Sequence, residues 1–357
     1  MLYFTLTAET PTGAEKIFKL SHYLKEIQMS AYNSHGKTIN DHFIAYSDEF
    51  YDVVGSDPQF YTVIETNAHE GPVYVAAENA LYFTTVPVSN NIPVANSKQV
   101  AIKRISLESA NFPLDPDAAT TVRSASNMAN GMTLDREGQL VICEQGTKVT
   151  PARISRMNLQ TGVVETIVDQ WRGLRFNSPN DVVVKSDGSV WFTDPSYGYL
   201  QGFKDSPLIG DYVYCYNGQT AVVADSFNKP NGLAFSPDES ILYINDSGAI
   251  QGPVSYYVNL PHHIRAFDVE GRHLVNERLF AVVSPGIPDG LKVDSEGRVY
   301  SSSASGLLVY NTTGDLIGEI VAPGVANFTF GGAGNNVLYM MADTVIWAAE
   351  IKAVGTR

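Results

Sequence analysis

Six polar residues recur along this chain, each at the start of a short apolar segment, and each has a side-chain oxygen atom. They are Glu70, Asn130, Asn180, Asn231, Asp289 and Asn327. Their successive separations are 60, 50, 51, 58 and 38 residues, which indicates a repeated structural unit. Equivalent positions of such units come together when the units surround one axis. Carboxylate and amide oxygens, without thiolates, are the hard ligands that Ca²⁺ prefers. The pattern therefore predicts a metal site.

A simpler interpretation exists for each position taken singly. Asn, Asp and Gly are common turn residues, and one Asn-Gly pair before a strand indicates only a turn. Turn chemistry does not require the same position in every repeat, so the set as a whole favours the metal site. Asn130 and Asn327 are the members for which a purely structural role is easiest to accept.

The segments after these residues predict the elements that position them. Each polar residue precedes an apolar strand, a tight turn such as Asp135-Arg136-Glu137-Gly138 or Ser186-Asp187-Gly188, and a second apolar strand such as Val190-Trp191-Phe192-Thr193. Two weaker strands usually follow. Four antiparallel strands per repeat, arranged radially, make a β-propeller blade. The sequence predicts an all-β fold, a six-bladed β-propeller.

The sixth repeat lacks residues for a full blade. Only a short tail follows Val345-Ile346-Trp347-Ala348, so we expect Tyr61-Thr62-Val63-Ile64 to supply its outer strand. The N- and C-terminal strands then share the closing blade, which leaves no exposed sheet edge at the junction. We predict an N-terminal extension over residues 1–42, with a short helix suggested by Ile17, Leu20, Leu24 and Ile27, and a propeller over residues 43–357.

Loop lengths predict which face of the propeller binds ligands. The connections that return to the polar residues are long, covering about residues 85–99, 145–152, 195–211 and 247–263. The hairpin turns on the opposite face have only a few residues. Long loops around one mouth mark that face as the binding face.

Composition excludes several classes of protein. The 357 residues carry a net charge of −14, which argues against nucleic-acid binding and against an anionic membrane surface. Only Cys143 and Cys215 occur, so no disulfide framework is implied and a reducing compartment fits. Because we find neither a signal-peptide pattern nor a membrane-spanning run, we expect a cytoplasmic protein. The oligomeric state is not predicted.

Five motifs, taken together and in order, resemble one family. They are His69-Glu70-Gly71-Pro72-Val73-Tyr74, Ser178-Pro179-Asn180-Asp181, Phe192-Thr193-Asp194-Pro195, Lys229-Pro230-Asn231-Gly232-Leu233-Ala234-Phe235-Ser236-Pro237-Asp238 and Pro288-Asp289-Gly290-Leu291. The chain resembles the gluconolactonase, regucalcin (senescence marker protein) and luciferin-regenerating-enzyme family over about residues 43–350, and within it the fungal lactonohydrolases.

The resemblance implies a six-bladed propeller with one divalent cation in its channel, usually Ca²⁺, or else Mg²⁺, Mn²⁺ or Zn²⁺. Matched by motif, the metal ligands are Glu70, Asn180, Asn231 and Asp289, and the catalytic residue is Asp289. No other cofactor is implied. The expected reaction is metal-dependent hydrolysis of a small-molecule lactone. The cation polarises the carbonyl, while Asp289 acts as base towards water or as nucleophile.

Four further residues are assigned to substrate binding: Asn130, Ser178, Tyr197 and His69. Several sugar-lactone members carry an arginine where this chain has Ser178, and the nearest upstream basic residue is Arg175. The mouth loops instead contain Tyr197, Tyr199, Phe203, Tyr256 and Tyr257, which favours a less polar lactone or, alternatively, reflects packing of the loops. His69 is either a neighbour of the metal ligands, a proton shuttle or a packing residue.

The fold alone does not determine the function. Two alternatives to a lactone hydrolase therefore stay open. One is a non-hydrolytic enzyme that catalyses rearrangement or cyclisation in a biosynthetic pathway. The other is a non-catalytic binding propeller whose metal only stabilises the channel.

Overall fold

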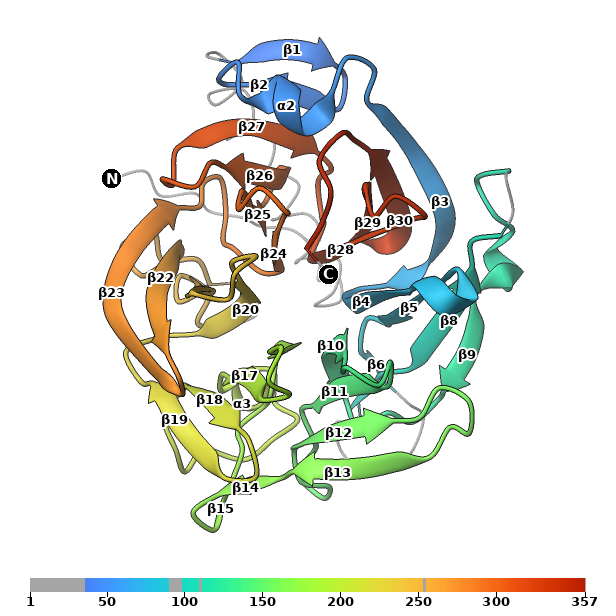
Figure 1. The fold of residues 1–357 in the computed structure, drawn as a ribbon. Helices are drawn as coiled ribbons and strands as arrows, with labels where there is room; N and C mark the ends of the chain where they lie inside the picture. Colours follow the sequence, from blue (N-terminus) through green and yellow to red (C-terminus); the bar gives the residue numbers. More distant parts are fainter. Residues whose placement is uncertain (1–35, 90–97, 109–110, 253–254, 357) are drawn as a thin grey trace, which may run out of the picture.

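The computed structural model describes residues 36–89, 98–108, 111–252 and 255–356. Within these residues six sheets of antiparallel strands surround a central axis, as Figure 1 shows. The predicted six-bladed β-propeller is confirmed. The helix suggested around Ile17–Ile27 lies outside the described residues.

Each blade runs outward from an innermost strand. Blade 1 contains β4 (Glu70–Val75), β5 (Ala80–Thr84), β8 (Ile102–Ser106) and β9 (Thr120–Arg123). Blade 2 contains β10 (Ala129–Leu134), β11 (Leu140–Glu144), β12 (Arg153–Met157) and β13 (Val164–Val168). Blade 3 contains β16 (Val182–Val184), β17 (Val190–Asp194), β18 (Tyr212–Tyr216) and β19 (Thr220–Ala224). Blade 4 contains β20 (Pro230–Phe235), β21 (Ile241–Asp246), β22 (His263–Glu270) and β23 (His273–Val282).

Blades 5 and 6 use strands from both parts of the chain. Blade 5 contains β24 (Leu291–Val293), β25 (Val299–Ser302), β26 (Gly306–Tyr310) and β27 (Leu316–Val321), and two early strands, β2 (Phe43–Ala45) and β1 (Lys37–Asn40), extend its outer edge. Blade 6 contains β28 (Asn327–Gly331), β29 (Val337–Met341), β30 (Asp343–Glu350) and β3 (Gln59–Ala68). The boundary predicted after residue 42 falls between β1 and β2, which belong to the same sheet.

The closing blade joins the two ends of the propeller. Strand β3 pairs antiparallel with β30, with Tyr61 opposite Ala348 and Thr62 opposite Trp347. The buried side chains of Val63 and Ile64 pack in the same core cluster as Leu81 of blade 1. The prediction that residues 61–64 complete the sixth blade is confirmed, and the cluster shows how closure also joins blade 6 to blade 1.

Backbone hydrogen bonds link the innermost strands around the axis. The Gly131 amide donates to the Asn180 carbonyl at 2.7 Å, and the Gly232 amide donates to the Asp289 carbonyl at 3.0 Å. A Cβ atom on Gly232 would lie 2.3 Å from that carbonyl oxygen. Glycine therefore follows these polar residues because neighbouring blades approach too closely for a side chain.

The short elements outside the blades lie mainly in the connecting loops. They are the helices α2 (Phe50–Val54) and α3 (Tyr197–Leu200), the 3₁₀ turns η1 (Ala76–Glu78) and η2 (Pro116–Ala118), and the two-stranded ribbons of β6 (Val88–Ser89) with β7 (Lys98–Gln99) and β14 (Gln170–Trp171) with β15 (Leu174–Arg175). None of the helices in the described residues is long and apolar enough to cross a membrane.

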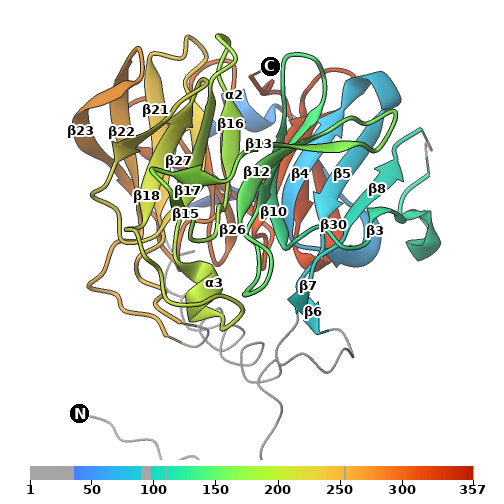
Figure 2. The same ribbon diagram turned by 90° about the horizontal axis from the view of Figure 1, so that it is seen from below.

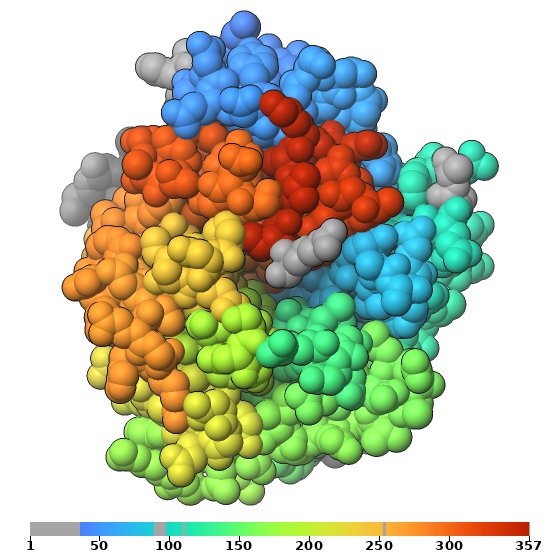
Figure 3. Space-filling view, viewed as in Figure 1, coloured from blue at the N-terminus to red at the C-terminus, as the bar shows by residue number. Residues whose placement is uncertain are grey.

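The two faces of the propeller differ in their connections. Figure 2 shows α3 and the β6–β7 ribbon projecting from one face, together with the loops that return to the innermost strands. The opposite face carries the short hairpin turns, and Figure 3 shows successive parts of the chain following one another around its centre. The long loops thus gather on the face where the innermost strands begin.

Candidate functional site

A cavity of about 210 Å³ opens on the face with the long loops. Its lining includes five of the six repeated polar residues, namely Glu70, Asn130, Asn180, Asn231 and Asp289. Glu70 begins β4, while Asn130 and Asn231 are the second residues of β10 and β20. Asn180 and Asp289 lie just before β16 and β24. The radial arrangement therefore brings residues from five blades to one cavity.

The sixth residue, Asn327, does not line this cavity but contacts a residue that does. Its side-chain amide donates to Glu70 Oε2 at 2.8 Å, and its own Oδ1 accepts from the Phe328 amide. Both polar ends of Asn327 are thus used within the protein. Its contact with Glu70 orients that carboxylate, which agrees with the structural role expected for this position.

The Asn231 side chain belongs to a short hydrogen-bonded chain. Its Nδ2 atom donates to Ser247 Oγ at 3.1 Å and, at 3.5 Å, to the Tyr197 hydroxyl. Ser247 Oγ donates in turn to the Pro288 carbonyl at 2.5 Å, directly before Asp289. Because Nδ2 is held by these contacts, the orientation of the Asn231 amide is set by the loops after β17 and β21.

The carboxyl groups repel one another across the channel. Burial, and then the charge of Glu70, raise the pKa of Asp289 well above its ordinary value. Asp181, which follows Asn180, is also buried, and burial raises its pKa to about 6. Burying several carboxyl groups close together costs free energy, and a positive charge between them would lower that cost.

His69 lies at the edge of the same cavity. Its Nδ1 atom lies 2.6 Å from Asp343 Oδ1, at the start of β30. Burial acts to lower the pKa of His69, but the hydrogen bond to Asp343 and the charge of Glu70 outweigh it and raise the pKa to about 9. The ring is therefore an imidazolium at neutral pH, and Nε2 is the ring atom from which it can give up a proton.

Tyr197 lines the cavity from α3. Burial, and then the charge of Asp289, raise the pKa of its phenol above the ordinary value, so the hydroxyl keeps its proton. Tyr199 on the same helix and Tyr257 are about half exposed, whereas Phe203 is buried next to Val100 and Met128. The aromatic residues of the mouth loops therefore differ in position: some line the cavity, some are exposed to solvent and some pack against other side chains.

Ser178 lies apart from the other predicted substrate-binding residues. It lines a separate cavity, and its Oγ atom accepts from the Gly198 amide at 2.8 Å. The amides of Asn177 and Ser178 both donate to Asp194, just as those of Asn228 and Lys229 donate to Asp246. These two aspartates cap the loops that lead into blades 3 and 4.

Several lining residues were not singled out from the sequence. They include Thr84, Thr85, Val100, Met128, Gln145, Gln201, Ile250 and Ile287. Asp343 and Ser247, which hold His69 and Asn231, were also missed. Thr84 and Ser247 stand at the ends of second strands, next to the predicted mouth, and that position is the signal that identifies them.

The donor set fits a hard divalent cation. Glu70, Asn180 and Asn231 are nearly fully buried, and Asn130 Oδ1 is buried with no hydrogen-bond partner among the described residues. The described part of the chain has no cluster of three or more His, Cys, Asp or Glu side chains suited to a metal. An ion in this cavity would therefore need amide as well as carboxylate oxygens, a mixture that Ca²⁺ accepts.

Comparisons with known proteins agree with this fold. The family model described as "SMP-30/Gluconolactonase/LRE-like region" matches residues 68–344. A gluconolactonase from Zymomonas mobilis is 27% identical over 302 residues, covering 83% of this chain and 80% of the relative. Lactonohydrolase oryL from Aspergillus oryzae is 27% identical over 317 residues, covering 80% of this chain and 69% of the relative. The solved structure of a gluconolactonase from Xanthomonas campestris superposes with a TM-score of 0.70 at 27% identity, covering 87% of this chain and 95% of that one.

Proposed function

The chain belongs to the SMP-30/gluconolactonase/LRE-like family, and from that membership and the channel geometry we propose that it is a metal-dependent lactone hydrolase. Hydrolysis of a lactone ester is the activity named for the relatives from Zymomonas mobilis and Aspergillus oryzae. A small-molecule lactone is accordingly the substrate class.

The main support for the proposal is the set of oxygen-bearing residues that line the central cavity. Glu70 and Asp289, on opposite halves of the sequence, line the same cavity with the amides of Asn130, Asn180 and Asn231. Burial, and then the charge of Glu70, raise the pKa of Asp289, so a charged carboxylate at this position costs free energy that a cation would offset. We assign Glu70, Asn180, Asn231 and Asp289 as the ligands of a divalent cation, with Ca²⁺ favoured by the oxygen donors.

Each protein group then has a distinct role. A cation held there supplies positive charge that stabilises negative charge developing on an ester oxygen. Asp289 either takes a proton from the attacking water or attacks the carbonyl carbon itself. Asn130, whose amide oxygen has no hydrogen-bond partner among the described residues, and Tyr197, whose hydroxyl keeps its proton, orient the lactone. His69, as an imidazolium, can donate its own Nε2 proton to the alkoxide released when the ring opens.

The lining also bears on the kind of lactone. The cavity combines the polar groups at the axis with apolar side chains from the loops, among them Ile250, Ile287, Val100 and Met128. Such walls favour a lactone whose ring or substituent is largely apolar over a polyhydroxylated sugar lactone.

A panel of lactones tests the function directly. Proton release is measured with aliphatic, aromatic and sugar lactones, before and after chelation and after restoring Ca²⁺. We expect turnover that is lost with chelator and recovered with Ca²⁺. Turnover unaffected by complete metal removal would contradict the metal role, and metal binding without turnover of any lactone would favour the rearrangement enzyme or the binding propeller.

A further inference from the structure

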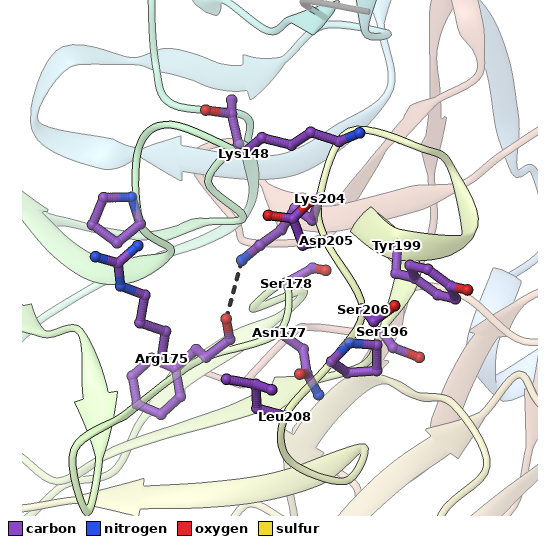
Figure 4. Close-up of a pocket in the computed structure, with 14 residues that line it drawn as sticks. Lys148, Arg175, Asn177, Ser178, Ser196, Tyr199, Lys204, Asp205, Ser206 and Leu208 are labelled. Atoms are coloured by element: carbon purple, nitrogen blue, oxygen red, sulfur yellow. Dashed lines mark hydrogen bonds between the residues drawn. The ribbon is translucent and has the colours of Figure 1, made fainter.

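A second cavity, of about 200 Å³, lies between the mouth loops of blades 2 and 3. Its lining comes from three chain segments, around residues 147–151, 175–178 and 196–208, and Figure 4 shows them converging. Helix α3 separates this cavity from the central one, since Tyr197 lines the central cavity and Tyr199 lines this one. This second cavity is not part of the catalytic channel described above.

The charged groups of this cavity are mostly basic. Lys148, Arg175 and Lys204 each come from a different segment, and the acidic lining residue is Asp205. The excess of basic over acidic residues in this cavity is opposite in sign to the net charge of the whole chain, which is −14. Basic side chains that converge on a concave site in an acidic protein attract anions locally.

Arg175 lacks the partners that other arginines of this protein have. Ion pairs hold Arg104, Arg123, Arg153, Arg156, Arg265, Arg278 and Arg298. Arg136 and Arg272 donate to backbone carbonyls, and Arg172 lies over the Trp171 ring. Arg175 alone has none of these contacts among the arginines at described positions. Its guanidinium can therefore donate a pair of hydrogen bonds to a planar or tetrahedral anion.

A backbone contact holds Lys204 in the lining of the cavity. Its ammonium group donates to the Phe176 carbonyl at 3.0 Å, as the dashed line in Figure 4 shows. Burial lowers the pKa of Lys204 to about 8, the charge of Asp194 opposes that shift, and Arg175 adds to it. Arg175 and Lys204 therefore repel each other while Asp194 attracts Lys204, and a bound anion between the two basic groups would offset their repulsion.

We propose that this cavity binds a small oxyanion, a carboxylate or a tetrahedral phosphate or sulfate group, through Arg175 and Lys204 with Lys148 at its rim. The volume lies below the roughly 300–1,000 Å³ of typical drug-sized sites, so the occupant is small. The proposal does not depend on lactone hydrolysis, because binding at this site can be measured in the absence of turnover.

Calorimetric titration of the calcium-loaded full chain tests the site. Sulfate serves as the tetrahedral probe and acetate as the carboxylate probe, at constant ionic strength. We expect saturable binding of at least one probe, and the tighter probe identifies the anion class. Losing one charge-assisted hydrogen bond lowers affinity about tenfold or more, so Arg175→Gln and Lys204→Met should each weaken binding at least to that extent.

Arg172→Gln is the matched control. Arg172 lies on the same ribbon, between β14 and β15, but does not line the cavity. Its substitution removes the same charge as Arg175→Gln does. We expect its affinity for the probe to stay within about twofold of the parent. Absence of saturable binding in the parent would overturn the proposal. Equal weakening by Arg172→Gln and Arg175→Gln would also overturn it, because it would show diffuse surface attraction. Thermal unfolding of each variant checks that the fold is retained.

Discussion

Asp289 is the residue on which the proposed chemistry depends. Replacing it with Asn keeps its size and removes the group that takes the proton or attacks the ester. We expect Asp289→Asn to lower kcat by about 10²–10⁴-fold, the usual contribution of a positioned acid or base. Steady-state hydrolysis of the best lactone in the panel measures the loss, and circular dichroism checks the fold. A kcat near the parent value would remove Asp289 from its role.

Glu70 tests the metal assignment without reference to turnover. Glu70→Gln keeps an oxygen towards Asn327 Nδ2 but removes one negative charge from the cavity. We expect calcium affinity, measured by calorimetry, to fall by at least about tenfold. Even the loss of a residue that only hydrogen-bonds to a metal ligand commonly lowers metal affinity by that factor.

Glu78 provides the matched control for Glu70. It belongs to the same blade but pairs with Arg104 at the surface, away from the channel. Glu78→Gln should therefore leave calcium affinity unchanged. If the two variants bind calcium equally well, Glu70 is not a ligand.

Between elements, Glu144 at the end of β11 connects two blades on the face with the long loops. Its fully buried carboxylate accepts from Arg123 of β9 in blade 1 at 2.7 Å and from Arg153 of β12 at 2.8 Å. Ser155 Oγ donates to it as well, at 2.7 Å. Burial acts to raise the pKa of Glu144, but the hydrogen bonds from Arg153 and Arg123 outweigh it and leave the pKa below the usual value of 4.5.

This cluster predicts a pH-dependent loss of stability. At pH 7 we expect Glu144→Gln to lower the free energy of unfolding by about 3 kcal/mol, at the lower end for a broken buried pair because both arginines keep some contact with water. A carboxyl with a lowered folded pKa contributes stability above its unfolded pKa and loses it as pH falls through the folded value. The difference between parent and variant should therefore shrink below about pH 4.5.

Denaturant unfolding across this pH range measures both effects. Glu165→Gln, on the exposed side of β13 in the same blade, is the control and should change stability by less than about 0.5 kcal/mol. A Glu144→Gln effect that stays constant with pH would show that the ion pairs are not its cause.

At the scale of the whole molecule, stability depends on how the propeller closes. Ile64 of β3 is fully buried, in the cluster that joins the closing blade to blade 1. We expect Ile64→Ala to lower the free energy of unfolding by about 2–5 kcal/mol, the usual cost of a large-to-small change in a core. Exposed Glu65, the next residue of the same strand, is the control, and Glu65→Ala should have little effect.

Tryptophan fluorescence can test whether closure of the propeller stabilises all of its blades. Trp347 lies in the closing blade and Trp191 in blade 3, so their signals sample distant parts of the propeller. If closure stabilises the whole propeller, Ile64→Ala should shift both signals together in thermal unfolding. Separate transitions would show that the blades unfold independently.

The sequence by itself determined the architecture and identified polar residues that meet at its axis. The polar residue, the apolar strands and the Asp- and Gly-containing turns are local signals, and repeating them predicts blades, their number and the face with long loops. It also identified seven of the residues that line the central cavity, namely His69, Glu70, Asn130, Asn180, Tyr197, Asn231 and Asp289. The pairing of β3 with β30 followed from counting strands.

Only the tertiary structure decided which polar atoms meet. Asn327 holds Glu70 from 257 residues away, and Asp343 holds His69 from 274 residues away. Ser178, two residues before Asn180, lines a different cavity because its loop is held by Asp194. Such contacts depend on how distant loops pack around the axis. A local repeat encodes the strand that begins at each position, but it does not encode the partner that another blade brings to it.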